Sequence, residues 1–210
     1  MAKGMFITFE GVEGSGKSTQ ARLLSASLRR AGRRALLTSE PGGTPLGRRI
    51  RKALLDPAGR VVPMAEWLLF EADRAAHVRQ VILPALRRGI TVVCDRYSDS
   101  SRAYQGFARG IGLARVDAVD RVATGGLKPG LTILLDMPAG EGLSRARRRG
   151  RMTRIDRERA RFHGLVRAAF LSLARREPRR FAVIDAREPA RAVAARIGAL
   201  VECRRSRGSR

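Results

Sequence analysis

A chain of 210 residues with 44% hydrophobic and 5% aromatic content can bury the core of one globular domain. It has no run of 18 apolar residues and no N-terminal signal region, so we expect a cytoplasmic protein without a membrane span. The formal net charge of +24 could suit a nucleic-acid-binding protein, but only four of the 43 basic residues are lysines and base-stacking aromatics are few. We therefore favour solvated charged faces, and we expect neither nucleic acid nor a membrane as a partner.

Short apolar runs alternate with amphipathic stretches along the chain. The runs at 5–9, 35–38, 90–94, 132–135 and 181–184 predict strands. The stretches near 17–31, 63–88, 113–124, 157–175 and 189–201 predict helices. This alternation predicts one α/β domain over residues 1–202, with a parallel sheet covered by helices on both faces. The small and charged residues 203–210 predict a disordered basic tail.

Residues 11–18 read G-V-E-G-S-G-K-S and satisfy the phosphate-loop pattern G-x-x-x-x-G-K-[ST] between a predicted strand and a predicted helix. The glycines allow backbone N–H groups to face phosphate oxygens, and the helix N-terminus adds partial positive charge. We expect Lys17 to reach the β and γ phosphates of ATP and Ser18 to offer its hydroxyl to Mg²⁺. The predicted ATP-binding residues are Gly11, Val12, Glu13, Gly14, Ser15, Gly16, Lys17, Ser18 and Thr19.

A second polar run, D-R-Y-S-D-S-S-R-A-Y-Q-G at 95–106, directly follows another predicted strand. Asp95 should therefore lie at the carboxyl edge of the sheet, where open α/β folds bind ligands. It could hold a Mg²⁺-bound water, while Arg96 could bind an acceptor phosphate through its guanidinium fork. A purely structural ion pair between the two residues is the alternative. The chain has no N-K-x-D string, which argues against a GTPase and favours a small kinase.

Five strings in order resemble the motifs of the bacterial thymidylate kinase family. They are F-E-G-V-E-G-S-G-K-S-T, S-E-P-G-G-T-P-L-G at 39–47, L-L-F-E-A-D-R-A-A-H at 68–77, the D-R-Y run, and L-D-M-P with a later arginine-rich segment ending in R-I-D. The resemblance covers nearly the whole chain. It implies a P-loop NTPase fold with a five-stranded parallel sheet, a short lid at about 145–161, a homodimer, and phosphorylation of dTMP to dTDP by Mg-ATP in dTTP synthesis.

The resemblance also implies an acceptor site. Phe70 and Arg74 lie four residues apart on one stripe of the predicted helix 63–88. By resemblance Phe70 stacks on the thymine ring and Arg74 donates to its O4, whereas composition alone would assign Phe70 to the core. Ser101 corresponds to a residue that contacts the pyrimidine edge, and Tyr104 to one beside the sugar. The implied substrate-binding residues are Glu13 (for the 3′-hydroxyl), Pro41, Arg51, Phe70, Arg74, Arg96, Ser101, Tyr104 and Gln105.

The lid segment 145–161 holds nine arginines in 17 residues. Members of the family that lack an arginine in the phosphate loop use one from the lid, and this loop has Gly14 and Ser15. Relatives usually have an acidic residue where this chain has Thr153, and Glu where it has Asp156. The candidate catalytic residues are Lys17, Arg96 and the lid residues Arg149, Arg151 and Arg154, with Arg154 first because it stands in the R-I-D string.

Two alternatives remain at this point. Another nucleoside monophosphate or deoxynucleoside kinase would share the phosphate loop and differ in its preferred base. A basic nucleic-acid-binding ATPase would instead turn over ATP in response to nucleic acid, without any monophosphate.

Overall fold

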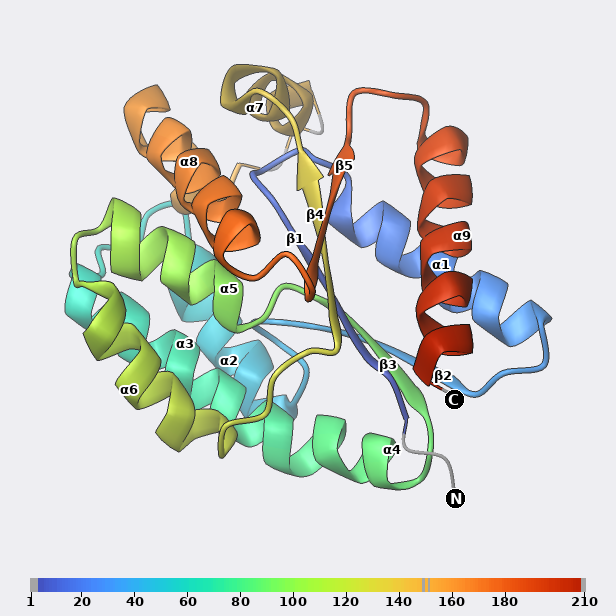
Figure 1. Cartoon of the computed structure of the whole chain (residues 1–210). Coiled ribbons are helices and arrows are strands. Elements are labelled where there is room, and N and C mark those ends of the chain that lie inside the picture. Colours follow the sequence, from blue (N-terminus) through green and yellow to red (C-terminus); the bar gives the residue numbers. More distant parts are fainter. Residues whose placement is uncertain (1–3, 149, 151, 209–210) are drawn as a thin grey trace.

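The computed structural model describes residues 4–148, 150 and 152–208. Within them, five parallel strands form one sheet in the order β2-β3-β1-β4-β5 (Figure 1). The strands are β1 (Phe6–Glu10), β2 (Ala35–Ser39), β3 (Thr91–Asp95), β4 (Leu131–Asp136) and β5 (Phe181–Asp185). The predicted fold class and all five predicted strands are confirmed, each strand to within one residue at either end.

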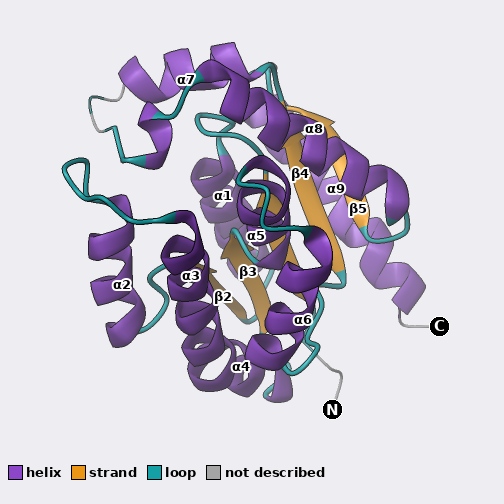
Figure 2. Cartoon of the chain, turned by 90° about the vertical axis from the view of Figure 1, so that its left-hand side faces the viewer, coloured by secondary structure: helices purple, strands orange, loops and turns teal. Residues whose placement is uncertain are grey.

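Helices cover both faces of this sheet, as Figures 1 and 2 show. On one face lie α1 (Lys17–Arg30) and α9 (Ala190–Gly208). On the other face lie α3 (Pro63–His77), η1 (Val78–Ile82), α4 (Leu83–Arg87), α5 (Ser98–Ser101), η2 (Arg102–Ala108), α6 (Leu113–Thr124) and α8 (Ala160–Arg176). Further helices are α2 (Pro45–Leu55), α7 (Ala139–Arg148) and the 3₁₀ turn η3 (Ile155–Arg157).

The predicted helix at 63–88 is one helical stretch that contains a π turn at Val78–Ile82. Pro84 follows that turn and has no amide hydrogen to donate to the preceding turn, a usual cause of irregular helix geometry. The helices α2, α7 and the α5–η2 stretch were not predicted. Among these, α2 carries recognisable start signals, because Thr44 caps it by accepting from the Gly47 amide at 2.9 Å and Pro45 opens it.

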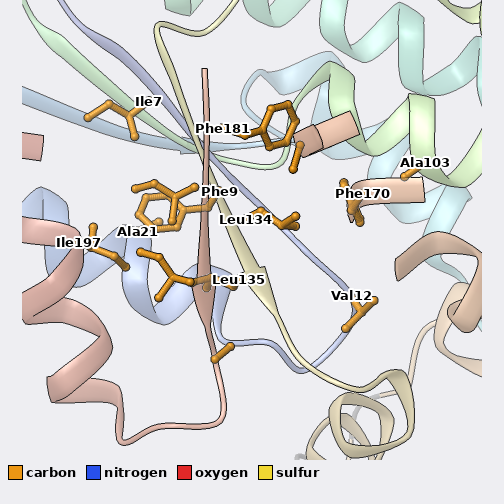
Figure 3. Packing of buried hydrophobic residues seen from close by; sticks show 14 of the residues in the cluster. Ile7, Phe9, Val12, Ala21, Ala103, Leu134, Leu135, Phe170, Phe181 and Ile197 are labelled. Carbon is orange, nitrogen blue, oxygen red and sulfur yellow. The ribbon is translucent and has the colours of Figure 1, made fainter. Parts of the chain in front are cut away.

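The core lies on both faces of β1 and β4, whose residues are almost all buried. Successive side chains of β4 alternate: Leu135 faces Ala21 and Ile197 from α1 and α9, whereas Leu134 faces the side of Phe170 in α8 (Figure 3). This double burial explains why the strands read as continuous apolar runs in the sequence.

The C-terminal segment differs from the expectation. The prediction of a disordered tail from residue 203 is corrected for 203–208, because α9 continues through Gly208. No proline interrupts this segment, and Ser206 Oγ donates to the Glu202 carbonyl at 3.1 Å while Arg33 pairs with the Glu202 carboxylate. Among the described residues, no helix has the length and apolar character needed to cross a bilayer.

Candidate active site

The phosphate loop joins the end of β1 to the start of α1. Gly16 precedes the helix in the left-handed region, with φ 91°, so the chain can turn sharply before Lys17. Lys17 is buried, and its Nζ donates to the Val12 carbonyl at 2.7 Å and to Ser15 Oγ at 3.3 Å. Burial and the nearby Arg96 charge lower the pKa of Lys17 to about 8. The loop thus holds the ammonium group over the position where its backbone can cradle a phosphate.

A backbone contact closes the loop from the lid side. A Cβ atom on Gly14 would lie 1.9 Å from the Gly142 carbonyl oxygen, and one on Gly142 would lie 2.2 Å from the Glu13 carbonyl oxygen. Gly14 also has φ +73°, which L side chains rarely adopt. The first turn of α7 therefore packs directly on the loop, and an arginine could not replace Gly14 without displacing that helix. This gives a physical reason for a loop that lacks an arginine.

Ser18 and Asp95 meet at the carboxyl edge of the sheet. Ser18 Oγ donates to Asp95 Oδ2, while Asp95 Oδ1 is buried with no hydrogen-bond partner in the described part of the chain. The described residues contain no cluster of three or more His, Cys, Asp or Glu side chains that would form a metal cage. A hydroxyl and one carboxylate fit Mg²⁺, which keeps waters and takes its remaining oxygens from phosphates.

A cavity of about 600 Å³ runs from the phosphate loop to α3. It brings together every predicted substrate-binding residue with Lys17, Ser18 and Asp95. The nine substrate-binding residues that line it are Glu13, Pro41, Arg51, Phe70, Arg74, Arg96, Ser101, Tyr104 and Gln105. Thr19 lies one turn into α1 and is not among the lining residues.

Glu13 and Arg96 form the charged centre of the cavity. Arg96 has φ 72°, an uncommon conformation for a residue with a side chain, and its Nη2 lies 3.1 Å from Glu13 Oε1. Tyr104 donates to the same oxygen at 2.5 Å, and His163 Nδ1 lies 3.0 Å from Glu13 Oε2. Burial alone would raise the pKa of Glu13, but His163, Arg96 and Lys17 outweigh it and lower the pKa to about 2. Glu13 is thus an ionised acceptor at neutral pH.

The far end of the cavity is organised around Arg74, which is almost fully buried. Its Nε donates to Glu40 at 2.9 Å, and its Nη1 donates to Glu71 at 2.6 Å and lies 3.3 Å from Asp120. Phe70, one turn earlier on α3, is only partly buried and lines the cavity. Both residues that resemblance assigned to the base therefore face the same space, as their helical spacing predicts.

The lid arginines differ from this pattern. Arg154 does not line the cavity. Its Nη2 donates to the buried Glu66 carboxylate and its Nε to the Leu54 carbonyl at 3.2 Å. Glu66 also accepts from Gln105 at 2.9 Å and from Arg109 at 3.2 Å, and these bonds lower its pKa against the effect of burial. In this structure Arg154 thus ties the lid to α3 instead of reaching into the phosphate site.

The two other lid candidates, Arg149 and Arg151, lie outside the described residues. Next to them, Thr153 uses both its amide and its hydroxyl to donate to Asp156 Oδ2, at 2.7 and 2.8 Å. The two departures from the family pattern therefore pair with each other and cap the turn that carries Arg154.

Sequence reasoning missed several buried charged residues that hold this site. Glu40, Glu66 and Asp120 could have been found as single acidic residues beside buried neighbours, because a buried charge needs a partner. His163 offered no such signal, since it follows the lid on α8 and belongs to none of the five strings. Its contact with Glu13 joins residues 150 positions apart.

A strand, a phosphate loop, a helix that begins with Lys17 and an acidic residue on the neighbouring strand define a P-loop phosphotransferase. The profile of the family described as thymidylate kinase matches residues 9–197. The chain is 52% identical to a thymidylate kinase of Deinococcus radiodurans over 96% of this chain and 98% of that protein. It is 48% identical to one of Pseudomonas putida over 94% of this chain and 96% of that protein.

Among solved structures, a thymidylate kinase from Ehrlichia chaffeensis superposes with a TM-score of 0.79 at 31% identity, covering 96% of this chain and all of that one. The chain therefore belongs to the thymidylate kinase family.

Proposed function

We propose that this protein transfers the γ-phosphoryl group of ATP to the 5′-phosphate of dTMP, yielding dTDP and ADP for dTTP synthesis. The observation that carries this proposal is one cavity with a phosphate loop at one end and Phe70 and Arg74 at the other. Its chemistry suits a molecule with a phosphate, a sugar and a flat base. The identity to bacterial thymidylate kinases supports the same acceptor.

The reaction needs positioning and charge stabilisation from the protein. An oxygen of the acceptor phosphate attacks Pγ, and the bond from Pγ to the ADP oxygen breaks as the new bond forms, without a covalent enzyme intermediate. Lys17 stabilises negative charge on the β and γ phosphate oxygens. Arg96 orients the acceptor phosphate with the help of Arg51, whose Nη1 is held by the Pro41 carbonyl at 2.8 Å.

Ser18 and Asp95 are the residues we propose for Mg²⁺. When bound, the ion neutralises charge on the phosphate oxygens as the bonds are exchanged. The unpartnered Asp95 Oδ1 supports this role, because a buried carboxylate oxygen without a donor is costly unless a ligand or its water satisfies it.

Base recognition would use groups that the protein leaves available. The bonds of Arg74 described above use Nε and Nη1, so Nη2 is the nitrogen that we propose donates to thymine O4. Ser101 Oγ is buried without a partner among the described residues, which supports a hydrogen bond to the pyrimidine edge. Phe70 supplies the stacking face. Tyr104 and Gln105 border the sugar, where bulk would disfavour a ribose 2′-hydroxyl.

For the lid, we propose Arg149 or Arg151 as the residue that stabilises the transferring group, and Arg154 as a third candidate that must first leave Glu66. We also propose that the protein acts as a cytoplasmic homodimer. Exposed Met64 and Leu68 on α3 and Phe107 on η2 give an apolar surface that supports association.

The test is a coupled ADP-release assay with ATP and each of dTMP, dUMP, dCMP, dAMP, dGMP and UMP. We expect the highest kcat/KM with dTMP. A higher kcat/KM with another monophosphate would assign the protein to a different acceptor. ATP turnover that requires nucleic acid and no monophosphate would support the alternative of a nucleic-acid-dependent ATPase.

A further inference from the structure

A buried histidine lies directly behind the charged centre of the cavity. His163 is in the first turns of α8 and is 1% exposed. Its Nδ1 is 3.0 Å from Glu13 Oε2, while its Nε2 is buried and has no hydrogen-bond partner in the part of the chain that the structure describes. The edge of its neighbour Phe162 packs against the ring, with centroids 5.5 Å apart.

The proton on this imidazole can be assigned from its partner. Glu13 is ionised at neutral pH, because its pKa is held at about 2, and a carboxylate only accepts hydrogen bonds. Nδ1 therefore carries a proton and donates to Glu13 Oε2. A leucine at this position would leave no unpaired nitrogen in an apolar environment, so packing alone does not account for an imidazole here.

The two oxygens of Glu13 are held from opposite directions. Oε1 accepts from Tyr104 and Arg96, which both belong to the D-R-Y segment, and Oε2 accepts from His163 on the helix that follows the lid. Two fixed oxygens define the plane of the carboxylate, whereas Oε1 alone would leave the group free to rotate about it.

We propose that His163 is a positioning residue for the acceptor sugar: its Nδ1–H fixes the carboxylate plane of Glu13 so that Glu13 accepts from the 3′-hydroxyl of the bound nucleotide. This inference rests on the proposed function, which supplies the sugar. The helix that follows the lid thereby helps to set the shape of the phosphate loop on the acceptor side.

The experiment compares two acceptors, dTMP and 3′-deoxythymidine monophosphate, on His163→Asn, His163→Gln and His163→Leu. The amide of asparagine can occupy the place of Nδ1, whereas that of glutamine reaches toward Nε2. We expect His163→Leu and His163→Gln to lose roughly tenfold in kcat/KM for dTMP, the effect of one hydrogen bond to a charged group, and His163→Asn to retain most of it. With the 3′-deoxy acceptor all three should resemble the unmodified protein.

Glu13→Gln, measured on the same two acceptors, separates the possible failures. If Glu13→Gln does not discriminate between the acceptors, the assigned role of Glu13 is wrong and the proposed function loses its sugar contact. If Glu13→Gln discriminates but the His163 variants lose equally with both acceptors, or Asn and Gln behave alike, His163 is not a positioning residue. Thermal melting identifies any variant that fails to fold, and the Asn and Gln pair decides the question even if His163→Leu is such a variant.

Discussion

The two ends of the cavity are built in opposite ways. The phosphate end comes from one continuous stretch, residues 11–18, and relies on backbone groups, small residues and one lysine. The acceptor end takes side chains from well-separated segments, among them Pro41, Phe70 and the run from Arg96 to Gln105. One end is therefore shaped by local chain geometry, and the other by charges that meet only in the folded protein.

Two buried groups at the acceptor end show how those charges are balanced. Arg74 is a guanidinium among three carboxylates, whereas Glu66 is a carboxylate that accepts from Gln105, Arg109 and Arg154. Removing the central member of either group would leave buried charges without partners, which costs far more than the loss of one contact. Substitutions at this end must therefore be isosteric to report on ligand binding instead of folding.

The largest effect is expected at the phosphate end from Lys17→Ala. Loss of the ammonium group should lower kcat by about 10²–10³, because charge on the transferring group is no longer stabilised. Steady-state kinetics measures this, with Lys52→Ala on the exposed side of α2 as the control. A Lys17→Ala protein that keeps more than about a hundredth of the turnover would contradict the assigned role.

The contact between α7 and the loop predicts the next effect. Gly142→Ala should destabilise the protein by about 1–3 kcal/mol, the usual cost of overpacking, and weaken ATP binding because the new Cβ meets the Glu13 carbonyl. Gly140→Ala is the matched control on the same helix, since its Cβ would meet nothing within 4 Å. Thermal melting and ATP titration measure both variants. Equal behaviour of the two would show that the helix does not press on the loop.

At the base end, Phe70→Ala should weaken dTMP binding about tenfold, since stacking of a base on an aromatic ring contributes about 1–3 kcal/mol. ATP affinity should stay unchanged. Phe107→Ala, at an exposed phenylalanine outside the cavity, is the control for calorimetric titrations with each nucleotide. Unchanged dTMP affinity would return Phe70 to a packing role. Arg74→Ala is a poorer test, because it strands three carboxylates.

The smallest effect is expected where the lid meets α3. Arg154→Ala and Glu66→Gln remove the same charged contact, so each should lower kcat roughly twofold to tenfold, as for one hydrogen bond, and the double variant should do no more. Arg157→Ala, at an exposed lid arginine, serves as control. A far greater loss of kcat for Arg154→Ala alone would mean that this arginine leaves Glu66 and acts on the transferring phosphoryl group.

Much of the molecule was readable from sequence, because the deciding interactions are local. The five strands carry continuous apolar runs since both faces of the sheet are covered, and the phosphate loop needs glycines and a lysine at fixed spacing. Helices with a clear apolar stripe were predicted as well. The helices at 45–55, 98–108 and 139–148 were missed because two of them are rich in polar or small residues and the other is short and capped by a single threonine.

The sequence by itself thus determined the fold class, the phosphate loop and the candidate residues of the acceptor site. Only the tertiary structure decided which side chains pair: that His163 donates to Glu13, that Arg74 collects three carboxylates, and that Arg154 lies on Glu66. The physical reason is that a buried charge must find its partner in space, and these partners are 3 to 150 residues apart along the chain. No periodicity or spacing in the sequence encodes such a distance.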